Sequence, residues 1–188
     1  MHKSATKTHN TTQRLTFIRH TKVADPSVCY GQMDVPLDSL DFEQTVKALQ
    51  KVYPNLTCIY SSPAKRCLVL AKALCRHVIV IDELLEMDFG DWQIKSWNDI
   101  DRSQIDDWAN DVLNYQIPNG ESCLTFYQRT KLGFDKLPNQ AVVITHGGTI
   151  RSAYNQLGGL NFEQSTHLKI EHGHVYHINS KSSTHSDQ

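Results

Sequence analysis

Four short apolar runs rich in β-branched residues divide the chain, at residues 14–19, 56–62, 78–82 and 141–146. Apolar and polar residues do not alternate strictly within these runs, which is typical of strands that are buried on both faces. Such strands usually run parallel to one another under a cover of helices. The pattern therefore predicts an α/β fold, a three-layer sandwich with a mainly parallel central sheet flanked by helices.

Segments with helical spacing of apolar residues lie between and after these runs. In the first segment, Val46, Leu49 and Val52 fall roughly on one face. Pro63 opens the second segment, where a missing backbone N–H costs nothing. Helices are expected at residues 40–52, 64–77, 97–115, 121–137 and 149–157.

The two ends of the chain lack this patterning. Residues 1–13 and 179–188 are polar and rich in Ser and Thr. Segments of this kind bury too little apolar surface to become ordered on their own. We therefore expect one folded domain over residues 14–178, with a disordered lead-in before it and a polar tail after it.

Composition and charge exclude several classes of partner. The formal net charge is -1, so the chain has no general attraction for nucleic acid or for an anionic membrane. No stretch approaches the about 20 apolar residues of a membrane span, and residues 1–13 lack the apolar segment of a signal peptide. Five cysteines without a CxxC pair indicate free thiols, so we expect a cytoplasmic protein. As a separate expectation, the protein is a monomer or a homodimer.

Charged and imidazole side chains follow the carboxyl ends of the predicted strands. They are Arg19 and His20 after the first run, Arg66 after the second, Glu86 after the third and His146 at the end of the fourth. Each one taken alone has an ordinary structural explanation, such as a hydrogen-bonded His or a surface charge. Ligands of open α/β sheets bind outside the carboxyl ends of the strands, so we expect these side chains to converge.

This set of side chains suits phosphoryl transfer. Guanidinium groups bind phosphate oxygens bidentately, and the N-terminus of a helix after Gly148 would add backbone N–H donors. A neutral imidazole is a nucleophile at phosphorus, and neighbouring guanidinium charges lower the pKa of His20. Glu86 is suited to protonate the leaving alkoxide and then to activate water. A metal site is the rival interpretation, but strong ligand spacings such as HExxH are absent and clustered Arg residues repel cations, so no metal or other cofactor is predicted.

The segments that carry these residues resemble the histidine phosphatase superfamily, the phosphoglycerate mutase-like proteins. The family's RHG, SSPxxR, E-x-x-x-G-x-W and THGG segments correspond, in order, to IRHT, SSPAKR, EMDFGDW and ITHGGTIR. YGQMDVPL at residues 30–37 resembles the family's substrate loop, and PNGES at residues 118–122 resembles its PGGES segment. The resemblance covers residues 15–178 and implies a phosphoglycerate mutase-like fold.

The resemblance also implies a role for each matching residue. The implied catalytic residues are a phosphohistidine nucleophile and a proton donor, His20 and Glu86. The implied phosphate-binding residues are Arg19, Arg66 and His146. Further candidate substrate-binding residues are Thr21, Tyr30, Gly31 and Gly147. The activity implied is that of a metal-independent acid-type phosphatase acting on a small phosphorylated metabolite.

Two positions depart from the family pattern. Thr21 stands where the family usually has Gly, and Pro26 stands where it often has Asn, six residues after the histidine. Thr21 still offers a backbone N–H and a hydroxyl, so phosphate binding is expected to survive. Pro26 removes one expected phosphate contact.

Within the superfamily, the compact chain and the EMDFGDW segment resemble the α-ribazole phosphatases of cobalamin biosynthesis, which act on α-ribazole 5′-phosphate in nucleotide-loop assembly. By this analogy Tyr30, Trp92 or Trp97 would stack on the substrate's benzimidazole-like base. The alternative is that both Trp side chains anchor the core or a lid.

Four other functions stay open at this stage: a broad-specificity phosphatase, a phosphoglycerate mutase-type enzyme, a phosphohistidine-protein phosphatase and a non-catalytic phosphate-ester binding module. The mutases of the family resemble longer chains, with inserts that shield the site from water. Glu86 disfavours the last two functions, because a nitrogen leaving group needs little acid help and a pure binder gains nothing from a carboxylate facing phosphate.

Overall fold

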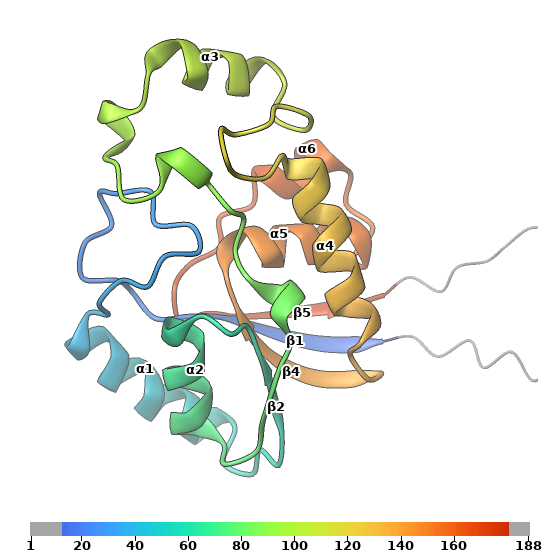
Figure 1. Cartoon of the computed structure of the whole chain (residues 1–188). Coiled ribbons are helices and arrows are strands. Elements are labelled where there is room, and N and C mark those ends of the chain that lie inside the picture. Colours follow the sequence, from blue (N-terminus) through green and yellow to red (C-terminus); the bar gives the residue numbers. More distant parts are fainter. Residues whose placement is uncertain (1–12, 181–188) are drawn as a thin grey trace, which may run out of the picture.

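Five strands form one sheet in the computed structural model, which describes residues 13–180 (Figure 1). The strands are β1 (Arg14–Arg19), β2 (Ile59–Ser61), β3 (Val78–Val80), β4 (Gln140–Thr145) and β5 (Val175–Asn179). Their order is β3-β2-β4-β1-β5, with β1 to β4 parallel and β5 antiparallel to β1. The predicted sandwich with a mainly parallel sheet is confirmed.

Helices cover both faces of this sheet (Figure 1). Helices α1 (Ser39–Val52) and α2 (Lys65–Leu74) lie on one face, and α4 (Cys123–Asp135) and α5 (Gly147–Gln156) lie on the other. The short helix α6 (Phe162–Thr166) packs beside α5, while α3 (Arg102–Asn110) lies apart from the sheet. Within residues 13–180, no helix has the length and apolar composition that a membrane crossing needs.

Neighbouring residues of β1 point into two different cores. Ile18 is buried with Leu49 and Leu70 under α1 and α2. Phe17 is buried on the opposite face, where its ring meets Phe134 of α4 edge to face at 5.9 Å between centroids. A strand with both faces buried has to be apolar on both, which is why the run shows no simple alternation.

A third apolar cluster is formed mainly by residues of the segment that connects β3 to α4 and by residues of α4. Trp92 is fully buried there, stacks on Tyr115 at 6.1 Å between ring centroids, and donates its indole N–H to the Gln104 side chain at 2.7 Å. Trp97 is 42% exposed and lies against Phe89. Trp92 is thus a core anchor, which was the alternative to base stacking. The prediction that its indole stacks on the substrate's base is wrong, because the ring is fully buried.

The single helix expected at residues 97–115 is wrong. The chain forms a short 3-10 helix, η3 (Trp97–Asp99), and then the separate helix α3. Two capping side chains account for the division, because Ser96 accepts from Asn98 N–H and Asp101 accepts from Ser103 N–H. Each capping residue starts a separate helix, whereas the apolar spacing had predicted a single helix.

Other elements differ at their ends. Helix α2 stops at Leu74 instead of residue 77, because Cys75 is already extended on the way to β3. Helix α5 begins at Gly147, two residues before the expected start. Four further elements were not predicted: β5, α6, η1 (Asp82–Leu84) and η2 (Gly90–Trp92).

The expected limits of the domain also need adjustment. Strand β5 reaches Asn179, and the N–H of Ser180 donates to the carbonyl of Gln13 at 3.0 Å. The paired region therefore extends slightly beyond residues 14–178. The rest of the expected lead-in and tail lies outside the described residues.

Candidate active site

The carboxyl ends of three parallel strands meet at one point of the sheet. Strand β4 lies between β2 and β1 and ends just before His146. The N–H of His20, after β1, donates to the Thr145 carbonyl at 3.0 Å, and the N–H of Ser62, after β2, donates to the Ile144 carbonyl at 2.9 Å. The rings of His20 and His146 are consequently 5.3 Å apart between centroids.

The His20 ring is oriented by its own backbone. Its Nδ1 lies 2.7 Å from the carbonyl oxygen of Thr21, and a carbonyl can only accept, so Nδ1 carries the proton. The lone pair is then on Nε2, where a nucleophile needs it. Burial, followed by the charges of Arg66 and Arg19, holds the pKa of His20 well below 6.5. The imidazole is therefore neutral, with burial the larger cause and the guanidinium charges the smaller.

Two guanidinium groups lie beside His20 without a carboxylate partner. Arg19 Nη1 donates to the Ile170 carbonyl at 2.6 Å, and Arg66 donates to the Met33 and Gly31 carbonyls at 2.8 and 2.5 Å. Neither guanidinium takes part in an ion pair among residues 13–180. The Nε of each is buried and has no hydrogen-bond partner in the same part of the chain. Two positive charges with unused donors form a binding site for an anion.

Tyr30 and Thr21 form part of the wall of this anion site. The Tyr30 ring lies 5.1 Å from the Arg66 guanidinium, and its hydroxyl accepts from Arg19 Nη2 at 3.5 Å. Thr21 is fully buried, and its hydroxyl has no partner within residues 13–180. Pro26 is exposed. Tyr30 is thus engaged with the arginines, whereas the hydroxyl of Thr21, next to His20 in the chain, is buried and unpartnered within residues 13–180.

His146 is held by neighbours that the sequence analysis did not single out. Its Nε2 lies 2.8 Å from the Ser62 hydroxyl and 3.6 Å from the Cys67 sulfur. The pKa of His146 is well below 6.5, first because of burial and then because of the Arg66 charge. Burial also raises the pKa of the Cys67 thiol to about 12, so the sulfur is a packing partner and not a nucleophile. Ser62 lies within the SSPAKR segment, so the motif could have identified it as a site residue from the sequence.

Glu86 reaches the site from the segment that follows β3 and η1. One carboxylate oxygen accepts from the Gly148 N–H at 3.0 Å, and the other accepts from the Met87 N–H at 3.0 Å. These two backbone donors fix the position of the carboxyl group at the start of α5. The N–H donors of this helix end were expected to bind phosphate, whereas in the structure the Gly148 N–H donates to Glu86.

The two glycines after His146 permit close approach and do not supply a turn. A Cβ on Gly148 would lie 2.2 Å from a Glu86 carboxylate oxygen, and one on Gly147 would lie 3.4 Å from the Arg19 guanidinium carbon. Both residues belong to the first turn of α5. The site uses the small size of Gly148, which leaves room for the Glu86 carboxylate.

His172 is a further site residue that the sequence analysis missed. Its ring lies 5.2 Å from that of His20 between centroids, and its Nε2 is buried without a partner among residues 13–180. Burial, followed by the Arg19 charge, lowers the pKa of His172 to about 4. His172 lies just before β5, and because that strand was not predicted, this residue could not be placed near β1.

An apolar cavity of about 570 Å³ adjoins the site at Glu86 and Gly148. Its wall is mostly aromatic and aliphatic, with Phe89, Trp108, Val112, Phe126, Tyr127 and Phe162 among the lining residues. Arg151 and Glu163 are the charged lining residues besides Glu86. The cavity can therefore take an apolar group attached to an anion that binds at the arginines.

The described part of the chain contains no cluster of side chains suited to bind a metal ion. Over residues 13–180, no group of three or more His, Cys, Asp or Glu side chains is arranged to hold a metal ion. The residues that do converge are His20, His146, Arg19, Arg66 and Glu86, as the strand ends predicted, with Tyr30, Thr21, Gly31 and Gly147 around them.

The chain is similar to known proteins over most of its length. The sequence profile described as histidine phosphatase superfamily (branch 1) matches residues 15–186. The Escherichia coli (strain K12) protein "Adenosylcobalamin/alpha-ribazole phosphatase" is 29% identical over 175 residues, 85% of this chain and 86% of that protein. "Putative phosphoserine phosphatase 2" of Hydrogenobacter thermophilus is 23% identical over 180 residues, 88% of this chain and 89% of that protein. The crystal structure of the α-ribazole phosphatase from Shigella flexneri has a TM-score of 0.77 at 24% identity, covering 89% of this chain and 93% of that one.

Proposed function

This chain belongs to the histidine phosphatase superfamily (branch 1), and from that premise we propose that it hydrolyses a phosphomonoester through a phosphohistidine formed on His20. The observation that carries the proposal is the pair of guanidinium groups of Arg19 and Arg66, each with a buried Nε, without an ion-pair partner in residues 13–180 and beside a neutral imidazole. A phosphate dianion supplies both the negative charge and the acceptor oxygens that such groups require.

In the first step, His20 Nε2 attacks phosphorus while the bond from phosphorus to the ester oxygen breaks. A protonated Glu86 gives its proton to the departing alkoxide, which leaves as an alcohol. In the second step, the Glu86 carboxylate takes a proton from water, whose oxygen attacks phosphorus as the bond to Nε2 breaks. Inorganic phosphate leaves, with His20 neutral and Glu86 protonated again, so protons and bonds balance over the cycle.

The substrate that we favour is α-ribazole 5′-phosphate, which would place the enzyme in the nucleotide-loop branch of cobalamin biosynthesis. The apolar cavity beside Glu86 supports this choice, because a benzimidazole-like base is flat and apolar and fits aromatic walls. The names of the E. coli and Shigella proteins support the same choice. The five cysteines are free, which fits the expected reducing cytoplasm.

Phosphoserine is the second candidate substrate. Arg151 and Glu163 line the cavity and offer one charge of each sign for the carboxylate and ammonium groups of serine. The name of the Hydrogenobacter protein supports this alternative. The predominantly apolar wall argues for the larger, flatter leaving group.

A panel of phosphate esters tests the reaction and the substrate together. We expect the purified protein to release inorganic phosphate from α-ribazole 5′-phosphate with a higher kcat/KM than from phosphoserine, and EDTA should leave the rate unchanged. A phosphorylated substrate labelled at phosphorus should give an acid-labile label on the protein, which His20→Ala removes together with turnover. Full turnover in His20→Ala would overturn the mechanism, and a preference for phosphoserine would overturn the substrate assignment.

A further inference from the structure

Glu86 lies in a stretch of chain that has no regular secondary structure. Residues 85–89 follow η1 and precede η2 and belong to no helix or strand, so the backbone of Glu86 itself has no place in a helical or sheet hydrogen-bond pattern. A general acid needs a fixed position relative to the bond it cleaves, because a displacement of about 1 Å is costly. Something other than secondary structure therefore has to hold this backbone.

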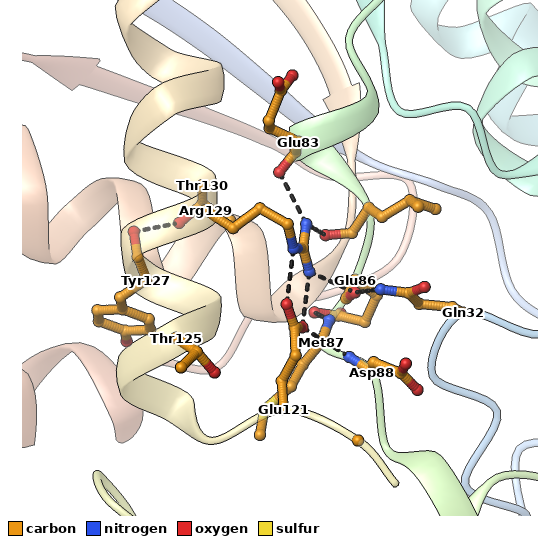
Figure 2. A network of polar contacts seen from close by, with 12 residues as sticks. Gln32, Glu83, Glu86, Met87, Asp88, Glu121, Thr125, Tyr127, Arg129 and Thr130 are labelled. Atoms are coloured by element: carbon orange, nitrogen blue, oxygen red, sulfur yellow. Dashed lines mark hydrogen bonds and ion pairs between the residues drawn. The ribbon is translucent and has the colours of Figure 1, made fainter.

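Arg129 of α4 supplies most of that support (Figure 2). Its Nη1 donates to the carbonyls of Glu83 and Leu85 at 2.9 and 3.1 Å. Its Nη2 donates to the carbonyl of Glu86 itself at 3.0 Å and to the Glu121 carboxylate at 2.8 Å. Its Nε donates to the other Glu121 oxygen at 2.7 Å. All five N–H groups of the guanidinium are thus used, three of them on the backbone around the acid.

Glu121, from the PNGES segment, completes the support on the other side of Glu86. Besides its two contacts with Arg129, its carboxylate accepts from the Asp88 N–H at 2.9 Å. Figure 2 shows the Arg129–Glu121 ion pair next to the backbone of Glu86 and Asp88. The side-chain amide of Gln32 donates to the Glu86 carbonyl from the opposite side at 3.0 Å. The Arg129–Glu121 pair therefore holds the chain on both sides of the acid.

The charge of Arg129 is used differently from the charges of Arg19 and Arg66. Glu121 neutralises it with two contacts, and the guanidinium packs 5.2 Å from the Phe126 ring. The two side chains are only 23% and 19% exposed, which makes the pair more rigid than a surface ion pair. A saturated and neutralised arginine is not available to phosphate.

We propose that Arg129 and Glu121 are positioning residues for Glu86, and that they act on the leaving-group step only through the placement of that carboxyl. This inference rests on the acid role given to Glu86 in the proposed function. A purely structural tie between α4 and the segment after β3 is the alternative, and it would affect all substrates alike.

Two esters with different leaving groups separate these possibilities. An alkyl phosphate such as glycerol 3-phosphate needs its leaving oxygen protonated, whereas p-nitrophenyl phosphate does not. For Arg129→Met we expect kcat on the alkyl ester to fall at least about tenfold more than kcat on the aryl ester. Arg129→Lys, with three donors on one atom, should recover part of the loss on the alkyl ester.

A double-mutant cycle with Glu86→Gln gives the decisive measurement. If Arg129 acts through Glu86, Arg129→Met should add no further selective loss on the alkyl ester once Glu86 is replaced. Losses that are equal on both esters, or that add fully in the double variant, would overturn the inference. Glu121→Gln, which keeps an acceptor for Arg129 and for the Asp88 N–H, repeats the test in a milder variant if Arg129→Met does not fold.

Lys131→Met is the matched control, because Lys131 is an exposed cation on the same helix that pairs with Asp135 at the surface. It should leave both rates unchanged. The two proposals fail in different ways. Absence of phosphate release from either ester in the wild-type protein would contradict the proposed function, while full activity with unselective losses in the Arg129 and Glu121 variants would contradict this inference alone.

Discussion

The reactivity of His20 is set by where its ring is buried and by what its Nδ1 donates to. The Thr21 carbonyl fixes the tautomer, and burial together with Arg66 and Arg19 keeps the ring neutral. A side chain of ordinary type thus becomes a nucleophile through its surroundings. That dependence can be measured as a pH profile.

We predict that the acid limb of kcat/KM for p-nitrophenyl phosphate lies below pH 6.5, the ordinary value for His. The enzyme needs His20 neutral, and a group with a lowered pKa stays neutral to lower pH, so activity should persist into mildly acidic solution. The measurement is kcat/KM across the acid range at constant ionic strength, corrected for the substrate's own ionisation.

Arg66→Met provides the comparison for this profile. Arg66 is the second cause of the lowered pKa of His20, after burial, so its removal should move the acid limb upward towards 6.5 as well as weaken phosphate binding. An acid limb at or above pH 6.5 in the wild-type protein would contradict the neutral nucleophile. An unmoved limb in the variant would contradict the part assigned to Arg66.

The site residues at strand ends could be predicted, and those brought in by other elements could not. His20, Arg66 and His146 follow apolar runs, and parallel strands bring their carboxyl ends to one edge. His172 and Arg129 lack that link, because one precedes an unpredicted strand and the other lies inside a helix. Their places depend on tertiary packing, which the spacing of apolar residues does not encode.

At the scale of elements, two glycines allow the segment after Glu86 to dock against the PNGES segment. Gly90 has a positive φ of 44°, and a Cβ on Gly120 would lie 2.5 Å from the Asp88 carbonyl oxygen. The backbones pair directly, with Glu121 N–H donating to the Asp88 carbonyl at 2.8 Å and Asp91 N–H donating to the Pro118 carbonyl at 2.9 Å. This contact brings the Glu121 carboxylate to Arg129.

We predict that Gly120→Ala destabilises the protein by about 1–3 kcal/mol, because backbone atoms on the facing segment leave no room for a methyl group. The displaced Glu121 should also lower kcat on alkyl phosphates more than on p-nitrophenyl phosphate. Urea unfolding and the two-ester assay measure the two effects. Asn110→Ala, an exposed change at the end of α3, should alter neither, and a Gly120→Ala protein with wild-type stability would show that the segments are not in close contact.

The elements that apolar spacing predicted well are the ones buried against the sheet. Strand β1 and helix α1 agree with their expected ranges within a residue. Strand β5 was missed because His177 interrupts its apolar residues Val175, Tyr176 and Ile178, and Ile178 alone in the strand is fully buried. The division at residues 97–115 was missed because caps at Ser96 and Asp101 decide it, and α3 has no buried residue to reveal its own face.

For the whole molecule, the active site is a group of polar side chains enclosed by apolar cores on both faces of the sheet. Its histidines are buried in the folded protein and become solvated on unfolding. Burial lowers the pKa of both His20 and His146 well below 6.5, the value that they regain in the unfolded chain. Proton binding therefore differs between the two states, and folding stability has to depend on pH.

Below pH 6.5 the unfolded chain binds protons at His20 and His146 that the folded protein does not bind, and His172, whose pKa burial lowers to about 4, behaves in the same way above that value. The free energy of unfolding should therefore fall as pH drops through pH 6.5, by at most about 1.4 kcal/mol per pH unit for each histidine and about 4 kcal/mol for the three. Urea unfolding at intervals between about pH 7.5 and pH 5 measures the slope above the range where carboxylates titrate. His146→Asn should reduce the slope by about a third whatever its effect on stability at neutral pH, while replacement of the exposed His77 by Asn should leave it unchanged. A free energy of unfolding that stays constant across this range would mean that these rings take up protons in the folded state, and a protonated His20 could not act as the nucleophile.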